Sequence, residues 1–387
     1  MQTEASLIEH GLAMLQSFPL PIIIFLAPLL YYLRFVRKFK SSAPKSAVND
    51  SGVITPDCGE FDMSNVRITK ILVHPIKSCK GTSVREAKYT AEGLENDRKW
   101  CIIRADNNAV LTAREAGTTV LIHPRIVSDL SPEGGRLEVT LPKTSGCEAF
   151  SVPLNPSEAT LQSWKTLDVS LWGKSDIEAF ICESIDSQSR SPSAILSEFL
   201  GLSVHLVMKG PRPRICPPTL RFPKLEAPSY FQDGYPLLVV SEESVAALQD
   251  RIRGMVGVQG VDEKWSSDKL LIERFRPNIV FKGAGAPFAE DVLTEFAIDS
   301  HRPGDAIDST APIIHLVSKC TRCLLPNVDT ETGIRDKAVP YKVMMKFRRG
   351  LDPENMSKPC MGCNGAVTGD GVVKVGDWVH ALKFGLV

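Results

Sequence analysis

The strongest constraint on the fold of this 387-residue chain is a pair of C-x-x-C motifs. Cys320 and Cys323 stand directly before a polar turn rich in Asp, Thr and Gly, and Cys360 and Cys363 follow within KPCMGCNG. Four thiolates at these spacings suggest a tetrahedral zinc site. Alternatively, one cysteine at the rim of a polar loop can present a thiolate to a soft redox metal. The choice between these two interpretations determines the class of protein.

The segment between the two pairs argues against a zinc ribbon. Residues 324–359 form a wider interval than compact zinc ribbons use, and they include a basic stretch, Tyr341–Arg349, that we expect to be an element of its own. If the four cysteines did hold zinc, the protein would be a membrane-tethered binding or scaffold module without redox turnover. From the residues alone, this alternative stays open.

Composition and missing motifs exclude several other classes. Lys and Arg (45) balance Asp and Glu (45), so the zero net charge gives no basic footprint for nucleic acid. Ten scattered cysteines are too few for a disulfide scaffold, and we expect them to be reduced. The sequence has no P-loop, G-x-S-x-G, H-E-x-x-H or Rossmann glycine pattern. Its length is ample for two packed domains.

An apolar segment near the N-terminus is a candidate membrane anchor. Residues 11–33 carry no charge, and FPLPIIIFLAPLLYYLRFV is at the short end of a span, which needs about 17–25 residues. A signal peptide would begin with a basic region, whereas Glu4 and Glu9 precede this segment. Basic residues instead follow it, which predicts an uncleaved helix over 18–36 with the rest in the cytosol. Residues 1–17 would then be a tail and 37–65 a basic flank and linker.

From residue 66 onward the sequence predicts a β-rich α+β fold. RKWCIIR and AVLTA are expected to pair as a hairpin, RLEVTLP alternates with the period of a strand, and GVVKVGDWVHAL is expected to form two strands around a turn. One helix is predicted between the N-cap Ser191 and the closing Gly201. A second is predicted from Ser241 to Gly254, with an apolar stripe at Val245, Leu248 and Ile252.

Several motifs resemble those of the MOSC family, and within it the membrane-anchored amidoxime-reducing components. The clearest are R-C-L-L-P-N-V-D-x-x-T-G around Cys323 and VVKVGDWVHAL near the C-terminus. HPIKSCKG, GLENDRKW, DGYPLLVVSEESVAAL and RFRPNIV occur upstream in the family's order. The resemblance runs from about Val66 to the end. It implies a MOSC-associated β-rich domain over 66–205 and a β-barrel-type MOSC domain over 206–387, preceded by the transmembrane helix.

The same resemblance implies a molybdenum–molybdopterin cofactor, with Cys323 as catalytic residue and metal ligand. Cys320 is expected not to ligate, because two adjacent cysteine ligands would fill the position that a substrate needs. The pterin carries a phosphate and a polar ring system, for which Arg provides a rigid bidentate donor. Relatives often carry a small hydroxyl residue where this chain has Tyr235. The predicted cofactor contacts are Lys77, Ser78, Arg98, Asp233, Arg276, Asn278, Arg322 and Asn364. Taken singly, each could be an ordinary turn or surface residue. Taken together, in the order in which the family has its motifs, they favour cofactor binding.

The implied activity is reduction of small N-hydroxylated molecules, such as amidoximes, hydroxylamines and N-hydroxylated bases. No flavin, haem or nicotinamide motif is visible, so electrons are expected to come from another protein. The resemblance implies cytochrome b5 and its NADH-dependent reductase at the mitochondrial outer membrane as that source. Lys342, Lys346, Arg348 and Arg349 are the predicted docking patch. A molybdenum-cofactor or sulfur carrier is a further alternative. MOSC domains also occur fused to a pyridoxal-phosphate cysteine desulfurase, a domain that we do not expect here.

Overall fold

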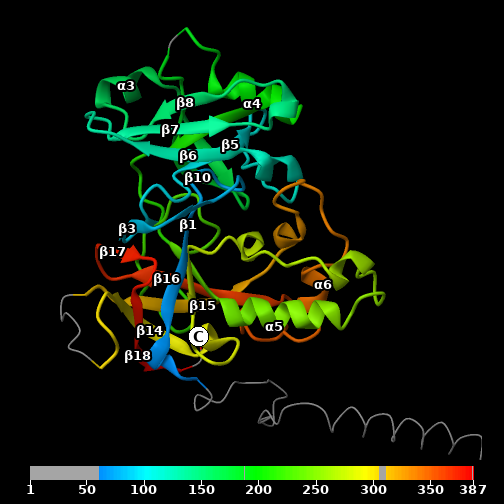
Figure 1. Ribbon diagram of the computed structural model, residues 1–387. Helices are drawn as coiled ribbons and strands as arrows, with labels where there is room; N and C mark the ends of the chain where they lie inside the picture. The colour runs from blue at the N-terminus through cyan, green and yellow to red at the C-terminus, as the bar shows by residue number, and fades with distance from the viewer. Residues whose placement is uncertain (1–60, 187, 305–310, 386) are drawn as a thin grey trace, which may run out of the picture. The chain divides into compact units, whose positions relative to one another are not determined.

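The computed structural model describes residues 61–186, 188–304, 311–385 and 387, which all belong to one compact unit, Cys58–Val387 (Figure 1). The predicted anchor at 18–36, the tail before it and most of the linker after it lie outside these described residues. Among the residues that are described, no helix has both the length and the apolar character needed to cross a membrane.

Seven strands close into a barrel. Their order is β13-β12-β16-β15-β14-β18-β1, and β1 pairs back with β13 while β2 extends the sheet beyond β1. Strands β12 and β13 run parallel, and the other neighbouring strands described in this sheet run antiparallel. The strands are β1 Arg67–Val73, β2 Thr82–Val84, β12 Leu237–Ser241, β13 Ile279–Lys282, β14 Leu293–Asp299, β15 Ile314–Thr321, β16 Cys360–Val367 and β18 Trp378–Phe384.

Side-chain alternation separates the interior of the barrel from its outer face. Val239 of β12 packs inside with Ile279 and Phe281 of β13, whereas its neighbour Val240 packs outside. Helices α5 (Glu242–Arg253) and α6 (Tyr341–Met344) cover this outer face (Figure 1). The predicted second helix is confirmed as α5: Ser241 caps it, Gly254 ends it, and the stripe at Val245, Leu248 and Ile252 is buried.

Most of residues 100–209 form a separate pair of sheets. A four-stranded sheet has the order β5-β11-β10-β9, and a three-stranded sheet has the order β6-β7-β8. Helix α4 packs with both sheets in one apolar cluster that includes Trp100, Leu137 and Leu196. The elements are β5 Trp100–Arg104, β6 His123–Ser128, β7 Gly135–Thr140, β8 Phe150–Pro153, α3 Glu158–Ser163, β9 Thr166–Leu171, β10 Lys174–Ile181, α4 Pro192–Leu200 and β11 Val204–Lys209.

A small sheet, β17-β3-β4, completes the described fold, with strands β3 Glu86–Thr90, β4 Gly93–Leu94 and β17 Gly371–Lys374. The predicted first helix is confirmed as α4, and RLEVTLP begins one residue inside β7 and covers the rest of that strand. The predicted hairpin is shorter than expected, because the arm opposite β5 makes one isolated bridge, between Ile103 and Val110. The final segment does form two strands, which pair into different sheets. The boundary expected at 205/206 stays a prediction.

Candidate functional site

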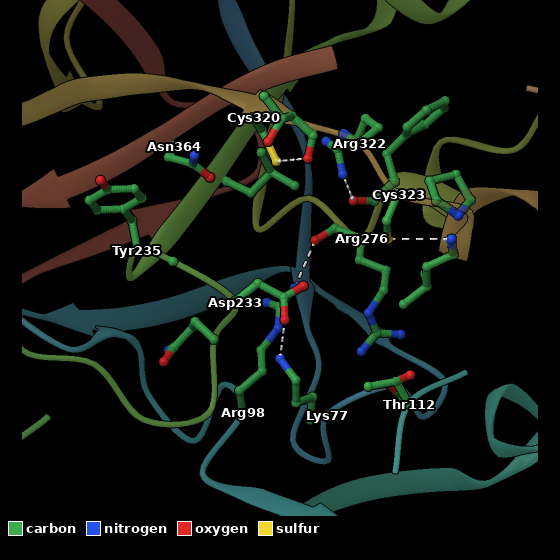
Figure 2. Close-up of a pocket in the computed structure, with 18 of the residues that line it drawn as sticks. Lys77, Arg98, Thr112, Asp233, Tyr235, Arg276, Cys320, Arg322, Cys323 and Asn364 are labelled. Atoms are coloured by element: carbon green, nitrogen blue, oxygen red, sulfur yellow. Dashed lines mark hydrogen bonds and ion pairs between the residues drawn. The ribbon is translucent and has the colours of Figure 1, made fainter. Parts of the chain in front are cut away.

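Loops that are far apart in the sequence line one pocket (Figure 2). It lies beside the beginnings of β12 and β13 and the end of β15, and its opposite wall comes from the loops around β1, β5 and β9–β10. Every residue predicted as a site residue lines this pocket: Lys77, Ser78, Arg98, Asp233, Arg276, Asn278, Arg322, Cys323 and Asn364. The fold therefore brings together groups that span almost 290 positions of sequence.

Cys323 stands just beyond the end of β15 and is partly exposed in the pocket. The backbone N–H of Leu325 donates to its Sγ at 3.5 Å. Its neighbour Cys320 is still on the strand and packs at the edge of the apolar cluster beneath α5, where burial raises the pKa of its thiol. Cys320 lines the same pocket, and the assignment of Cys323 as the metal ligand stays a prediction.

The second pair of cysteines belongs to the core. Cys360 and Cys363 are fully buried in β16, and the Cys363 thiol donates to the carbonyl of Glu290 at 3.1 Å. Burial raises the pKa of Cys360 to about 12. Across the described residues, which include all four paired cysteines, no three His, Cys, Asp or Glu side chains are grouped to hold a metal. The structure contradicts the Cys₄ zinc alternative, because the four paired cysteines do not gather into a metal-binding group.

A basic residue, Lys77, and an acidic residue, Asp233, both line the pocket. Lys77 Nζ makes an ion pair with Asp233 and donates to the carbonyl of Phe231 at 2.7 Å. Partial desolvation in the pocket raises the pKa of Asp233, but the charge and hydrogen bond of Lys77, together with the charges of Arg98 and Arg114, outweigh it and leave that pKa below its usual value. Burial also lowers the pKa of Lys77, against the opposing effect of Asp233. These two residues, predicted separately, are therefore in direct contact.

Arg98 and Arg276 lie side by side with their charges incompletely matched. Arg98 donates through Nη1 to Asp97 at 2.5 Å and through Nη2 to the carbonyl of Arg276 at 2.9 Å. Arg276 Nη1 donates to the carbonyl of Cys79, while its buried Nη2 has no hydrogen-bond partner among the described residues. Burial, together with the nearby charge of Arg98, lowers the pKa of Arg276 to about 10. An anionic ligand would pair with the charges of the Arg98 and Arg276 guanidinium groups.

The backbone around these cations is unusual. Ser78, Arg98 and Arg276 have φ angles of 69°, 51° and 56°, in the left-handed region that non-glycine residues seldom adopt. Such conformations persist where the surrounding structure determines them, and they cluster at functional sites. Here the surrounding contacts include the hydrogen bond from the Arg98 N–H to the carbonyl of His74. These three residues are among those that the motifs singled out.

Three predicted residues line the pocket but use polar groups to hold the fold. The Arg322 guanidinium donates to the carbonyls of Met361 and Phe275. The Asn278 amide accepts from the N–H of Leu238 at 3.1 Å and donates to the carbonyl of Leu72 at 3.3 Å. Asn364 donates to the Ser318 hydroxyl at 3.0 Å. These side chains fix the strands around the pocket, and their contact with a cofactor stays a prediction.

Other lining residues were not predicted, among them Thr112, Arg114, Trp172 and Gln232. Tyr235 also lines the pocket, and burial raises the pKa of its hydroxyl to about 12, so it remains protonated at neutral pH. Trp172 followed by Gly173 between two apolar strands signals a tight turn. Nothing in that local pattern indicates that the turn reaches a site built around residues 233, 276 and 323.

The predicted docking patch needs one correction. Arg348 is only 4% exposed, forms an ion pair with Asp291 at 2.7 Å, and lies 4.0 Å from the ring centroid of Phe288. It cannot present its charge to a partner, because those contacts hold it beneath the surface. Lys342, Lys346 and Arg349 are exposed.

Comparison with known proteins agrees with the resemblance seen in the motifs. The MOSC N-terminal beta barrel domain matches residues 65–188, and the MOSC domain matches residues 227–380. Mitochondrial amidoxime-reducing component 1 of Mus musculus is 29% identical over 324 residues, covering 81% of this chain and 82% of that protein. The Danio rerio protein of the same name is 29% identical, with coverages of 82% and 85%, and component 2 of Homo sapiens is 27% identical, with coverages of 81% and 83%. The chain therefore belongs to the MOSC family and carries both its N-terminal and its MOSC domain.

Proposed function

We propose that this protein is a molybdenum-cofactor-dependent oxidoreductase that reduces small N-hydroxylated molecules. The observation that carries the proposal is the unpartnered, buried Nη2 of Arg276, which lines the same pocket as Arg98, Lys77 and the accessible Cys323. The names of relatives that share about 29% of their residues with this chain give independent support.

The donor set of the pocket fits a pterin cofactor. Cys323 would supply the one protein thiolate, which suits a soft metal centre. Arg98, Arg276 and Lys77 would hold the phosphate and the polar edges of the pterin, with Ser78 beside them. When bound, the cofactor would supply the two-electron chemistry. The protein would supply binding, orientation and the hydrogen bonds around it.

Reduction of an amidoxime consumes two electrons and two protons. The N–O bond breaks, the nitrogen keeps one added proton, and the oxygen leaves as water, so an amidoxime becomes an amidine. In this pocket Asp233 stays ionised beside Lys77, whereas the Tyr235 hydroxyl keeps its proton and can donate a hydrogen bond. Arg276 and Arg98 would offset negative charge near the reaction centre. We assign the general-acid role to no side chain.

Elemental analysis tests the proposal directly. The purified protein should contain about one molybdenum per chain, together with a pterin, and it should reduce benzamidoxime when supplied with a small reductant such as reduced methyl viologen. Stoichiometric zinc without molybdenum would contradict the proposal. Molybdenum without any turnover would instead support a cofactor carrier.

We also propose that the electrons come from a cytochrome b5 and its NADH-dependent reductase at the outer mitochondrial membrane, where residues 18–36 would anchor the chain. The word "mitochondrial" in the names of the relatives supports the location. The exposed cations Lys342, Lys346 and Arg349 support a docking surface for an acidic haem protein. A fluorescent protein fused after residue 60 should colocalise with an outer-membrane marker, and a soluble distribution would contradict the anchor.

A further inference from the structure

The turn between β9 and β10 places a tryptophan where the backbone favours a different residue. Leu171 pairs with Lys174, so the loop consists of Trp172 and Gly173 alone. Their φ angles are 56° and 78°. Two-residue turns with positive φ at both positions strongly favour Asn-Gly or Asp-Gly, and a bulky side chain at the first position is an outlier. The turn itself therefore does not explain Trp172.

Packing does not explain Trp172 either. The side chain is 50% exposed and belongs to none of the apolar clusters formed by the described residues, although Leu171 beside it is buried in one of them. The other four tryptophans, at positions 100, 164, 265 and 378, are each less than 10% exposed. Neither the turn nor the packing therefore explains this half-exposed indole, and strained residues of this kind cluster at functional sites.

The contacts of the ring point into the pocket. Trp172 lines it together with Cys323, Arg276 and Asp233. The Arg114 guanidinium carbon lies 4.5 Å from the ring centroid, and Lys77 Nζ lies 5.8 Å from it. Cations at these distances interact with the ring face and hold the indole in place. The pocket thus has a flat, electron-rich wall beside the groups proposed to bind the cofactor.

We propose that Trp172, held by Arg114, is a specificity-determining residue that stacks on planar N-hydroxylated substrates, namely aryl amidoximes and N-hydroxylated heteroaromatic bases. This inference rests on the proposed function and narrows its substrate class. A planar aromatic substrate gains stacking energy on the indole, which a small aliphatic substrate or hydroxylamine cannot obtain. The protein therefore prefers aromatic N–OH compounds through KM, and Trp172 leaves the chemical step unchanged.

Trp172→Asn provides the sharpest test, because Asn-Gly suits this turn better than Trp-Gly. The variant holoenzyme should unfold at the same temperature or a higher one, and it should retain its molybdenum. Its KM for benzamidoxime should rise about three- to tenfold with kcat unchanged, since aromatic pairs contribute about 0.5–1.5 kcal/mol. Its KM for hydroxylamine should not change. Trp172→Phe should restore benzamidoxime to within about twofold of the wild-type value.

Binding without turnover gives a second readout. Calorimetric titration of benzamidoxime into oxidised holoenzyme without reductant should show a Kd weakened by the same factor in Trp172→Asn, and by little in Trp172→Phe. Equal losses for benzamidoxime and hydroxylamine, or a loss of molybdenum, would overturn the inference and assign the ring to the cofactor or the fold. If the wild-type protein reduced neither compound, the proposed function would fail. An unchanged Kd for benzamidoxime in Trp172→Asn would, independently of turnover, reject the stacking role.

Discussion

The two C-x-x-C pairs of this chain have the same spacing and opposite environments. Cys323 follows the end of β15, where strand pairing stops and its thiol reaches a pocket lined by cations. Cys360 and Cys363 lie within β16, where neighbouring strands on both sides bury them completely. The difference shows that a metal-ligand spacing acquires chemical meaning only from the secondary structure that carries it. In β16, Cys360 and Cys363 are core residues.

The largest expected effect separates the two pairs by function. Cys323→Ser should lower turnover of benzamidoxime per molybdenum by more than about four orders of magnitude, as loss of a group acting at the reaction centre does in other enzymes. Cys363→Ser should retain most of the turnover per folded molecule, because that thiol contacts the Glu290 carbonyl in the core. The measurement is turnover with a small reductant, normalised to molybdenum. Wild-type rates in a cofactor-replete Cys323→Ser protein would refute the ligand assignment.

The burial of Cys360 and Cys363 can also be tested through the residues that contact them. Arg348 donates through Nε to the carbonyl of Cys360 at 3.0 Å and pairs with Asp291, which lies 3.8 Å from the Cys363 thiol. Arg348→Ala would leave Asp291 buried and unpaired, so the free energy of unfolding should fall by about 3–5 kcal/mol. Arg349→Ala, next in the chain and exposed, should change it by less than about 0.5 kcal/mol. Similar denaturation midpoints for the two variants would contradict the buried network.

Local signals predicted local structure well. Caps at Ser191, Gly201 and Ser241 marked two helices correctly, because a cap needs only its own turn of backbone. The pairing of β1 with β13, about 200 residues later, closes the barrel and has no local signature. Arg348 was misplaced for a related reason. Helix α6 spans only Tyr341–Met344, so no helical periodicity continues to show which of the following cations turns inward.

The pocket was predictable only in part. Nine residues chosen from ordered motifs do meet in it, because those motifs occupy the loops that the barrel brings together. The motifs could not distinguish side chains that face a ligand from those that hold the strands, such as Arg322 with its carbonyl partners. Trp172 and Arg114 were missed because their loops belong to the part of the chain, residues 100–209, that forms the separate pair of sheets. Assigning them requires tertiary structure.

Alkylation compares the two pairs in one protein. The pKa of Cys360 rises from 9.0 to about 12, so at pH 8 its thiolate fraction falls about a thousandfold. In cofactor-free protein, iodoacetamide should therefore modify Cys323 first and reach Cys360 and Cys363 only after unfolding. Any slow reaction of Cys360 should accelerate about tenfold per pH unit below pH 12 while the fold persists. Peptide mass spectrometry measures each site. Equal labelling of Cys323 and Cys360 would show that β16 is not sealed.

The smallest expected effect concerns the segment that joins the two pairs, where adjacent arginines point in different directions. Because Arg348 is buried, reversing its charge would test the fold, so a test of docking has to use Lys346 and Arg349. Lys346→Glu combined with Arg349→Glu should slow NADH-driven turnover through cytochrome b5 about two- to tenfold at low salt, and the difference should shrink as ionic strength rises. Lys143→Glu, at an exposed cation between β7 and β8, should have no effect. Turnover with reduced methyl viologen should stay unchanged in all variants, since a small reductant needs no docking face. Equal losses with both reductants would assign Lys346 and Arg349 to the pocket or the fold and remove the docking surface.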